Sequence, residues 1–285
     1  MTLIGCDFSS SPSKRKPIVV AVGHAKSGRV QLQSLLRFDT LVSFADWLKQ
    51  PQAWVGGFDL PFGLPRELVE TLGWPIDWLS CMQHFTALSR AEIRDTFKAF
   101  CDARPVGGKF AHRATDTPAG SSPSMKWVNP PVAYMLHAGV PLLIEAGVTM
   151  PRLHAPAVLA DKPEPSVSSS SSLRIALEAY PGLLARELIG NTSYKSDDKA
   201  KQTPERLIAR KQLLQALEVG QTRLDLRLKL THAQHDILVD DASGDSLDAV
   251  LCMVQAAWAQ AQQEAGDAHY GLPECDPLEG WIVTA

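Results

Sequence analysis

Three aspartates stand where apolar segments of the chain end or begin, and their type and position suit them for chemistry. Asp7 follows the apolar run LIGC, and Asp59 follows VGGF. Asp248 lies in DDASGDSLDAV, where the last long apolar stripe of the chain starts. A carboxylate beside buried strand residues is costly unless it is paired, hydrogen-bonded or bound to a cation. The three positions therefore predict an acidic site.

Two more acids are spaced to join this site. Asp245 lies three residues before Asp248, so in a helix the two side chains share one face beside the apolar stripe. Glu178, in LEAYP, ends another apolar segment. Simpler explanations exist for both: an acid in the first turn of a helix complements its dipole, which accounts for Asp245, and Glu178 could be a surface residue of a strand.

Converging carboxylates limit what such a site can do. Like charges held a few ångströms apart repel, so they share protons or bind hard cations. Carboxylates from several strands and one helix suit two Mg²⁺ ions, or Mn²⁺ in their place, about 3.5–4 Å apart; such a pair activates a water for phosphodiester cleavage. We therefore expect Asp7, Asp59 and Asp248 to be metal ligands.

Basic residues that could meet phosphate groups lie in two places. Arg113, in HRATD, can bind phosphate oxygens through its guanidinium, although a loop-stabilising Arg–Asp pair explains it equally well. Lys195 and Lys199 open a stretch that offers a local patch for nucleic acid, although a solvated helical face is the simpler interpretation. Against five acids, the basic residues of this stretch are Lys195, Lys199, Lys201, Arg206, Arg210, Lys211, Arg223, Arg227 and Lys229.

The strands that must position the acids are predicted from apolar runs and turn residues. A Ser/Pro/Lys turn and Gly23–Gly28 separate the first three, which favours an antiparallel meander. An amphipathic helix over Val42–Lys49 then leads to a strand that should pair in parallel. The five predicted strands are Thr2–Phe8, Ile18–Val22, Val30–Phe38, Trp54–Leu60 and Leu173–Tyr180, with a closing strand expected at Glu279–Thr284.

Helical patterns dominate the middle and the end of the chain. Thr203 is placed as an N-cap, and Ser243 can cap the last helix, whose apolar stripe runs from Leu247 to Trp258. Proline at residue 181 suits the first turn of another helix. The remaining predicted helices are Pro65–Leu72, Asp77–His84, Arg90–Phe100, Val132–Glu145 and Pro204–Leu217.

These patterns divide the chain into one discontinuous core and an insertion. Residues 1–60 and 173–285 form the two parts of the core, and residues 61–172 form a mostly helical insertion or cap over the sheet. Within it, Arg104–Pro131 is rich in Gly, Ser and Pro. Pro151–Ser172 holds four prolines and a run of serines, a composition that predicts a mobile loop.

Bulk composition excludes several classes of protein. The chain has 285 residues, 45% of them apolar, and no apolar window long enough to span a bilayer. Its start reads as a strand rather than a signal peptide. The five cysteines are scattered without a CxxC pair, which favours a reducing cytoplasm. A net charge of −3 argues against non-specific coating of nucleic acid, so binding would use a local patch.

The order of elements resembles the ribonuclease-H-like fold: a meander with an acid in its first strand, a strand ending in an acid, and a late helix bearing DxxDA. The segment GDSLDAV resembles the last acidic motif of the Holliday-junction resolvase branch. The set IGCDFSS, GGFDLPFGLP, HRATD, EAYP, DxxDA and EGWI resembles an uncharacterised group of predicted nucleases, the domain of unknown function family 429, over nearly the whole chain.

This resemblance implies an α/β fold with a mixed five-stranded sheet, three antiparallel strands and then parallel ones, flanked by helices. It implies Asp7, Asp59 and Asp248 as core acids, with Glu178 and Asp245 as additional ones. The expected activity is metal-dependent hydrolysis of phosphodiester bonds. The nuclease label of the family is itself inferred from fold, which does not establish function.

Two other functions fit parts of the sequence. A phosphotransferase of the actin and sugar-kinase class also begins with a strand meander, but it needs a glycine-containing phosphate hairpin, which DFSSSPSKRK does not supply. A binding protein could keep the fold without chemistry. Phosphate loops of the GxxxxGK[ST] and GxGxxG types and the GxSxG hydrolase motif are all absent from the sequence.

Overall fold

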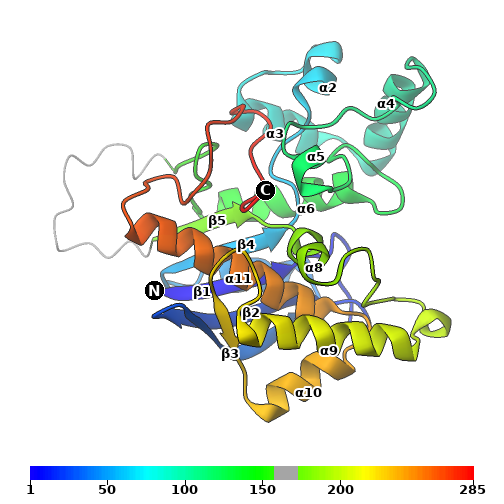
Figure 1. The fold of residues 1–285 in the computed structure, drawn as a ribbon. Helices are drawn as coiled ribbons and strands as arrows, with labels where there is room; N and C mark the ends of the chain where they lie inside the picture. Colours follow the sequence, from blue (N-terminus) through cyan, green and yellow to red (C-terminus); the bar gives the residue numbers. More distant parts are fainter. Residues whose placement is uncertain (157–172) are drawn as a thin grey trace.

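The computed structural model describes residues 1–156 and 173–285 (Figure 1). The loop predicted over Pro151–Ser172 falls mostly on residues 157–172, outside the described residues. In the part of it that is described, the backbone N–H of His154 donates to the carbonyl of Met150 over 2.8 Å. None of the helices in the described ranges has the length and apolar character that crossing a bilayer requires.

A mixed sheet of six strands forms the centre of the molecule, in the order β5-β4-β1-β2-β3-β6. The β1/β2 and β2/β3 pairs are antiparallel, as the meander predicts, whereas β4 pairs in parallel with β1 and with β5. The strands are β1 (Thr2–Asp7), β2 (Ile18–Lys26), β3 (Arg29–Phe38), β4 (Trp54–Asp59), β5 (Arg174–Glu178) and β6 (Arg227–Lys229).

Three details of the predicted sheet are wrong. The sheet has a sixth strand, β6, parallel to β3, whose three residues are too few to show an alternation. Strand β2 continues through Gly23 at a bulge, and the turn is confined to Ser27 and Gly28. Glu279–Thr284 is not a strand, because its backbone bonds to scattered partners: Ile282 N–H donates to the hydroxyl of Thr115, and Val283 N–H to the carbonyl of Glu178.

Helices cover both faces of the sheet. The expected helices form within a few residues of their predicted ends, and α10, which the sequence patterns did not mark, follows β6. The helices are α1 (Leu41–Leu48), α2 (Arg66–Thr71), α3 (Trp78–Ala87), α4 (Arg90–Asp102), α5 (Asp116–Ala119), α6 (Val132–Glu145), α8 (Pro181–Ile189), the 3-10 turn η1 (Lys199–Lys201), α9 (Pro204–Val219), α10 (His232–Asp240) and α11 (Asp245–Glu264).

Side chains that alternate along the strands build two separate apolar cores. Leu3 and Val55 point to the face that packs against α8, α9, α10 and α11. Ile4 and Phe58 point to the other face, which packs against α1, α3, α4 and α6. The helices of the predicted insertion therefore share one core with the sheet. Figure 1 shows α11 lying across the sheet and α2 to α5 grouped beyond its β5 edge.

Helix α11 packs against the sheet at two glycines. A Cβ atom on Gly5 would lie 2.0 Å from the carbonyl oxygen of Ala249, and one on Gly57 would lie 2.4 Å from that of Cys252. Only residues without a side chain allow the helix backbone to come so close. Because side chains alternate along a strand, the acids two residues later, Asp7 and Asp59, point to the same face as these glycines.

Replacing Gly5 by alanine should therefore force α11 away from the sheet. We expect Gly5→Ala to lower the free energy of unfolding by about 3 kcal/mol, the cost of overpacking against backbone that cannot move aside. Urea denaturation followed by circular dichroism measures this loss. Gly108→Ala is the control, because a Cβ there would meet nothing closer than 3.9 Å. Equal stability of the two variants would contradict the close contact of α11 with β1.

Candidate metal centre

Strand register brings the first two acids together. In the parallel pair formed by β1 and β4, Asp7 is the direct partner of Asp59, and both are the last residues of their strands. Carboxyl ends of parallel strands form one edge of a sheet, where ligand sites of open α/β sheets lie. The two carboxylates predicted at strand ends are thus neighbours at this edge.

Helix α11 supplies the third acid from its first turn. Its N-cap is Gly244, at φ +80°, and not Ser243 as expected. The hydroxyl of Ser243 instead donates to Asp241 over 2.6 Å, and the same carboxylate accepts the backbone N–H of Ser246 over 2.9 Å. Asp241 therefore closes the start of the helix. This leaves the side chain of Asp248 free to point at the sheet edge.

One oxygen from each of Asp7, Asp59 and Asp248 can be chosen so that all three lie within 4.8 Å of one another. Asp248 is fully buried and Asp7 is 9% exposed. Oxygens at this spacing, from side chains held by strand ends and a helix, are the hard donors that Mg²⁺ and Mn²⁺ prefer. The cluster can hold a metal ion.

Two neighbouring residues contact the third acid. The hydroxyl of Tyr194 donates to Oδ1 of Asp248, and the ammonium of Lys195 donates to Oδ2. The carboxylate of Asp248 is therefore fixed from both sides. Lys195 was expected to meet a phosphate, and its ammonium does lie at the acidic site. In this structure its partner is the carboxylate of Asp248.

Burial and the negative charge of neighbouring acids make Asp7 and Asp59 reluctant to ionise. Burial raises the pKa of Asp7 well above its usual range, and the nearby charge of Asp248 raises it further. Burial raises the pKa of Asp59 to about 7, although Lys195 acts against this. A carboxyl that holds its proton near neutral pH needs a nearby cation to ionise fully. The single positive charge of Lys195 does not balance the negative charge of the three carboxylates when they are ionised.

Arg210 positions the loop that carries Tyr194 and Lys195. Its Nη1 donates to the carbonyl of Tyr194 over 2.8 Å and its Nε to the carbonyl of Val239 over 2.7 Å. Arg210 as a whole is 4% exposed. Gly244 allows Lys195 to lie close to the start of α11, because a Cβ at residue 244 would lie 2.6 Å from the Cβ of Lys195. Arg210, assigned to a basic patch, is therefore a structural residue of the acidic site.

Glu178 and Arg113, expected at the acids and at a phosphate, bind each other in the structure. Glu178 is buried at the same sheet end, but its two oxygens bind Nη1 and Nη2 of Arg113 over 2.8 and 2.6 Å. All five guanidinium donors of Arg113 are used, by Glu178, Asp116 and the carbonyl of Glu279. None remains for a phosphate. The Arg–Asp pair weighed as the simpler explanation is present, at 2.9 Å between Arg113 and Asp116.

Asp245 and Lys199 are not members of the group of three acids. Asp245 is buried and accepts from the ammonium of Lys16 over 2.6 Å, which neutralises it. Burial raises the pKa of Asp245, and Lys16 opposes that rise. Lys199 begins the exposed turn η1 and makes no contact with the acids. Asp245 therefore borders the cluster as a paired charge.

Sequence reasoning missed three residues that shape the site, namely Tyr194, Lys16 and Arg210. Tyr194 is a single aromatic residue in a loop, so no periodicity marks it. Lys16 lies in the SPSKRKP turn between β1 and β2, where composition indicates only a turn. Its pairing with Asp245, in the segment DDASGD, could be predicted only if the two segments were known to lie side by side. The basic stretch itself is spread over a loop, η1, α9 and β6, and does not form one helical face.

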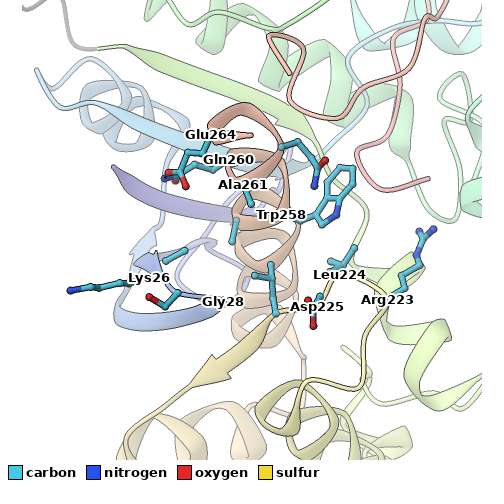
Figure 2. Close-up of a pocket in the computed structure, with 14 residues that line it drawn as sticks. Lys26, Gly28, Arg223, Leu224, Asp225, Trp258, Gln260, Ala261 and Glu264 are labelled. Atoms are coloured by element: carbon cyan, nitrogen blue, oxygen red, sulfur yellow. Dashed lines mark hydrogen bonds between the residues drawn. The ribbon is translucent and has the colours of Figure 1, made fainter. Parts of the chain in front are cut away.

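Another pocket lies at the opposite end of α11 and is separate from the acids (Figure 2). It has a volume of about 400 Å³, between Trp258 and Ala261 of the helix, the β2–β3 turn at Gly28, and Asp225. The residues that line it include none of the site residues expected from the sequence. The acidic cluster instead borders two other hollows, which share Asp59 and Lys195.

Comparison with protein-family models, with curated proteins and with solved structures finds no match to this chain.

The pairing of Arg113 leads to a prediction about stability. Arg113→Ala should lower the free energy of unfolding by about 3–5 kcal/mol, because it leaves the buried carboxylates of Glu178 and Asp116 without a partner. Urea denaturation measures this change. Arg94→Ala is the control: Arg94 pairs with Asp95 at the surface, and such pairs contribute at most about 1 kcal/mol. A stable Arg113→Ala protein would show that the buried network is not formed.

The raised pKa of Asp59 predicts how stability depends on pH. The folded chain binds a proton at Asp59 up to about pH 7, whereas the unfolded chain releases it near its ordinary value of 3.8, so the ionised carboxylate penalises folding above neutral pH. In EDTA, Asp59→Asn should raise the free energy of unfolding by about 2 kcal/mol at about pH 8.

This gain should shrink toward zero as the pH falls to about 4, where the wild-type carboxyl is already neutral in the folded chain. Denaturation curves at several pH values measure it. Asp46→Asn, at an exposed position of α1, serves as control. A gain that is the same at every pH would refute the assigned titration.

Proposed function

We propose that this protein is a divalent-metal-dependent nuclease or phosphodiesterase with a ribonuclease-H-like core, using Mg²⁺ or Mn²⁺. The observation that carries this proposal is the convergence of Asp7, Asp59 and Asp248, whose oxygens lie within 4.8 Å of one another. The order of elements supports it: a meander of three strands, two parallel strands, and a late helix with the last acid. This is the arrangement that the sequence resemblance implies.

The charge balance favours a divalent ion over a structural ion-pair cluster. When all three aspartates are ionised, the ammonium of Lys195 neutralises one of three negative charges. The neighbouring acids are already paired, Asp245 with Lys16 and Glu178 with Arg113. Two negative charges therefore remain in a poorly solvated place. A doubly charged cation matches this deficit, and oxygen donors suit Mg²⁺ or Mn²⁺.

Each residue of the cluster has a distinct part in the proposed reaction. Asp7, Asp59 and Asp248 would hold the cations, which when bound lower the pKa of water and stabilise a leaving oxygen. Tyr194 fixes the orientation of the Asp248 carboxylate through its hydroxyl. Lys195 is 41% exposed at its side chain, so its ammonium can also meet a phosphate oxygen from the solvent side.

The proposal is tested by cleavage assays with Mg²⁺ or Mn²⁺ on single-stranded, branched and RNA-hybrid substrates. We expect hydrolysis that EDTA abolishes and that Asp7→Asn reduces at least about 100-fold, because a metal ligand is lost. Asp46→Asn, remote from the sheet edge, should keep full activity. Transfer of phosphate from ATP to a small acceptor would instead support the kinase alternative.

Metal binding itself gives a readout that does not depend on the substrate. Titration calorimetry with Mn²⁺ should detect binding to the wild-type protein, and the ion should raise its melting temperature because it binds the folded state. Both effects should disappear in Asp248→Asn. Wild-type protein that binds neither Mg²⁺ nor Mn²⁺ at millimolar concentration would end the nuclease proposal.

A further inference from the structure

A cavity of about 320 Å³ opens directly beside the acidic cluster, at the carboxyl ends of β4 and β5. Asp59 and Lys195 stand at its border with the cluster. Its opposite wall comes from the segment between α5 and the first turn of α6. Its lining includes Leu60, Val132, Met135, Tyr180 and Ile282.

The inside of this cavity is mainly apolar. Leu60 and Ile282 are buried, and Met135 and Val132 present partly exposed apolar side chains. The two charged residues deeper in its wall, Arg113 and Glu178, are bound to each other and offer no free charge. Among the lining residues, the positive charge open to a phosphate is that of Lys195 at the border, whereas a flat, weakly polar group would find apolar surfaces and a tyrosine ring farther in.

A second hollow also borders Asp59, and its lining is more polar than that of the cavity. Its volume is about 300 Å³, and it is lined by the polar loop 190–195 and by Arg186. Tyr180 lines both hollows, and the guanidinium of Arg186 lies 5.3 Å from the centre of its ring. The second hollow thus offers more polar surface and an additional positive charge, whereas the cavity is mainly apolar.

We propose that the apolar cavity binds the base of an unpaired nucleotide, with the phosphate of that nucleotide at Asp7, Asp59 and Asp248 and the next stretch of backbone toward Arg186. This inference rests on the proposed phosphodiester chemistry and names its substrate class. A base inside a duplex cannot enter such a cavity without leaving its stack, which costs free energy. The substrate is therefore single-stranded nucleic acid or a free nucleotide, which share this chemistry.

The size and composition of the cavity agree with this occupant. Its volume lies at the low end of the range of about 300–1,000 Å³ for small-molecule sites. Bases bind proteins by stacking on aromatic side chains and packing against apolar ones, largely without regard to sequence. Such packing should strengthen binding at least about tenfold over a sugar phosphate that lacks the base.

The test uses the full chain with Ca²⁺ in place of Mg²⁺, so that binding is measured without cleavage. Calorimetry first measures Ca²⁺ binding alone, and then compares thymidine 5′-monophosphate with deoxyribose 5-phosphate. We expect the nucleotide to bind at least about tenfold more tightly. Met135→Trp, which fills the cavity, should abolish this preference and leave Ca²⁺ binding unchanged.

Tyr134→Trp is the matched control, because Tyr134 is the neighbouring residue of α6 but contacts Arg90 and does not line the cavity. It should keep the preference for the nucleotide. A short oligothymidine that binds more tightly than the mononucleotide would assign the cavity to single strands, and equal binding would assign it to a free nucleotide.

Three results would overturn the inference while leaving the metal site intact: equal binding of nucleotide and sugar phosphate by the wild-type protein, an unchanged preference in Met135→Trp, or a blunt duplex that binds as tightly as the single strand. Failure of Ca²⁺ binding in the first titration would be a different outcome, since it would remove the proposed function itself.

Discussion

The contact of α11 with bare backbone at Gly5 and Gly57 is the constraint on which the rest of the structure depends. It sets the distance between the helix and the sheet, and through the alternation of the strands it also sets which face carries the acids. Asp7 and Asp59 lie two residues beyond these glycines, and Asp248 lies one residue before Ala249, whose carbonyl meets Gly5. The packing of α11 on these two glycines thus determines the position of all three carboxylates.

Holding several carboxylates together costs electrostatic free energy. The surrounding residues neutralise some of these acids and leave others largely without a counter-charge. Outer acids are neutralised locally, Asp245 by Lys16 and Glu178 by Arg113, so they contribute structure. The inner three are left with a single ammonium and with raised pKa values at Asp7 and Asp59. Perturbed carboxyls of this kind, at a sheet edge beside hollows, are characteristic of functional sites. The contrast between paired and unpaired acids is the main physical reason for assigning a function here.

Much of this architecture could be predicted from the sequence because it is local. Apolar runs bounded by turn residues mark β1 to β5, and the stripe from Leu247 to Trp258 marks α11, so the edge where Asp7, Asp59 and Asp248 meet follows from the order of elements. The bond of Arg113 to Glu178 and the partners of Lys16 and Arg210 could not be predicted, because the tertiary fold alone brings these residues together. Strand β6 was missed since three residues are too short to carry a pattern.

The position of Lys195 on Asp248 has a consequence for how the chain reaches its folded state. An internal ammonium already serves Asp248 as a counter-ion, so the chain can bury this carboxylate without an ion from solution. The metal ion proposed above would join a cluster that already holds one positive charge. An ion of higher valence would gain more from the remaining negative charges than sodium or potassium would, because the attraction scales with the charge of the ion. In this arrangement the fold can form before the ion binds, and the ion does not have to displace the lysine.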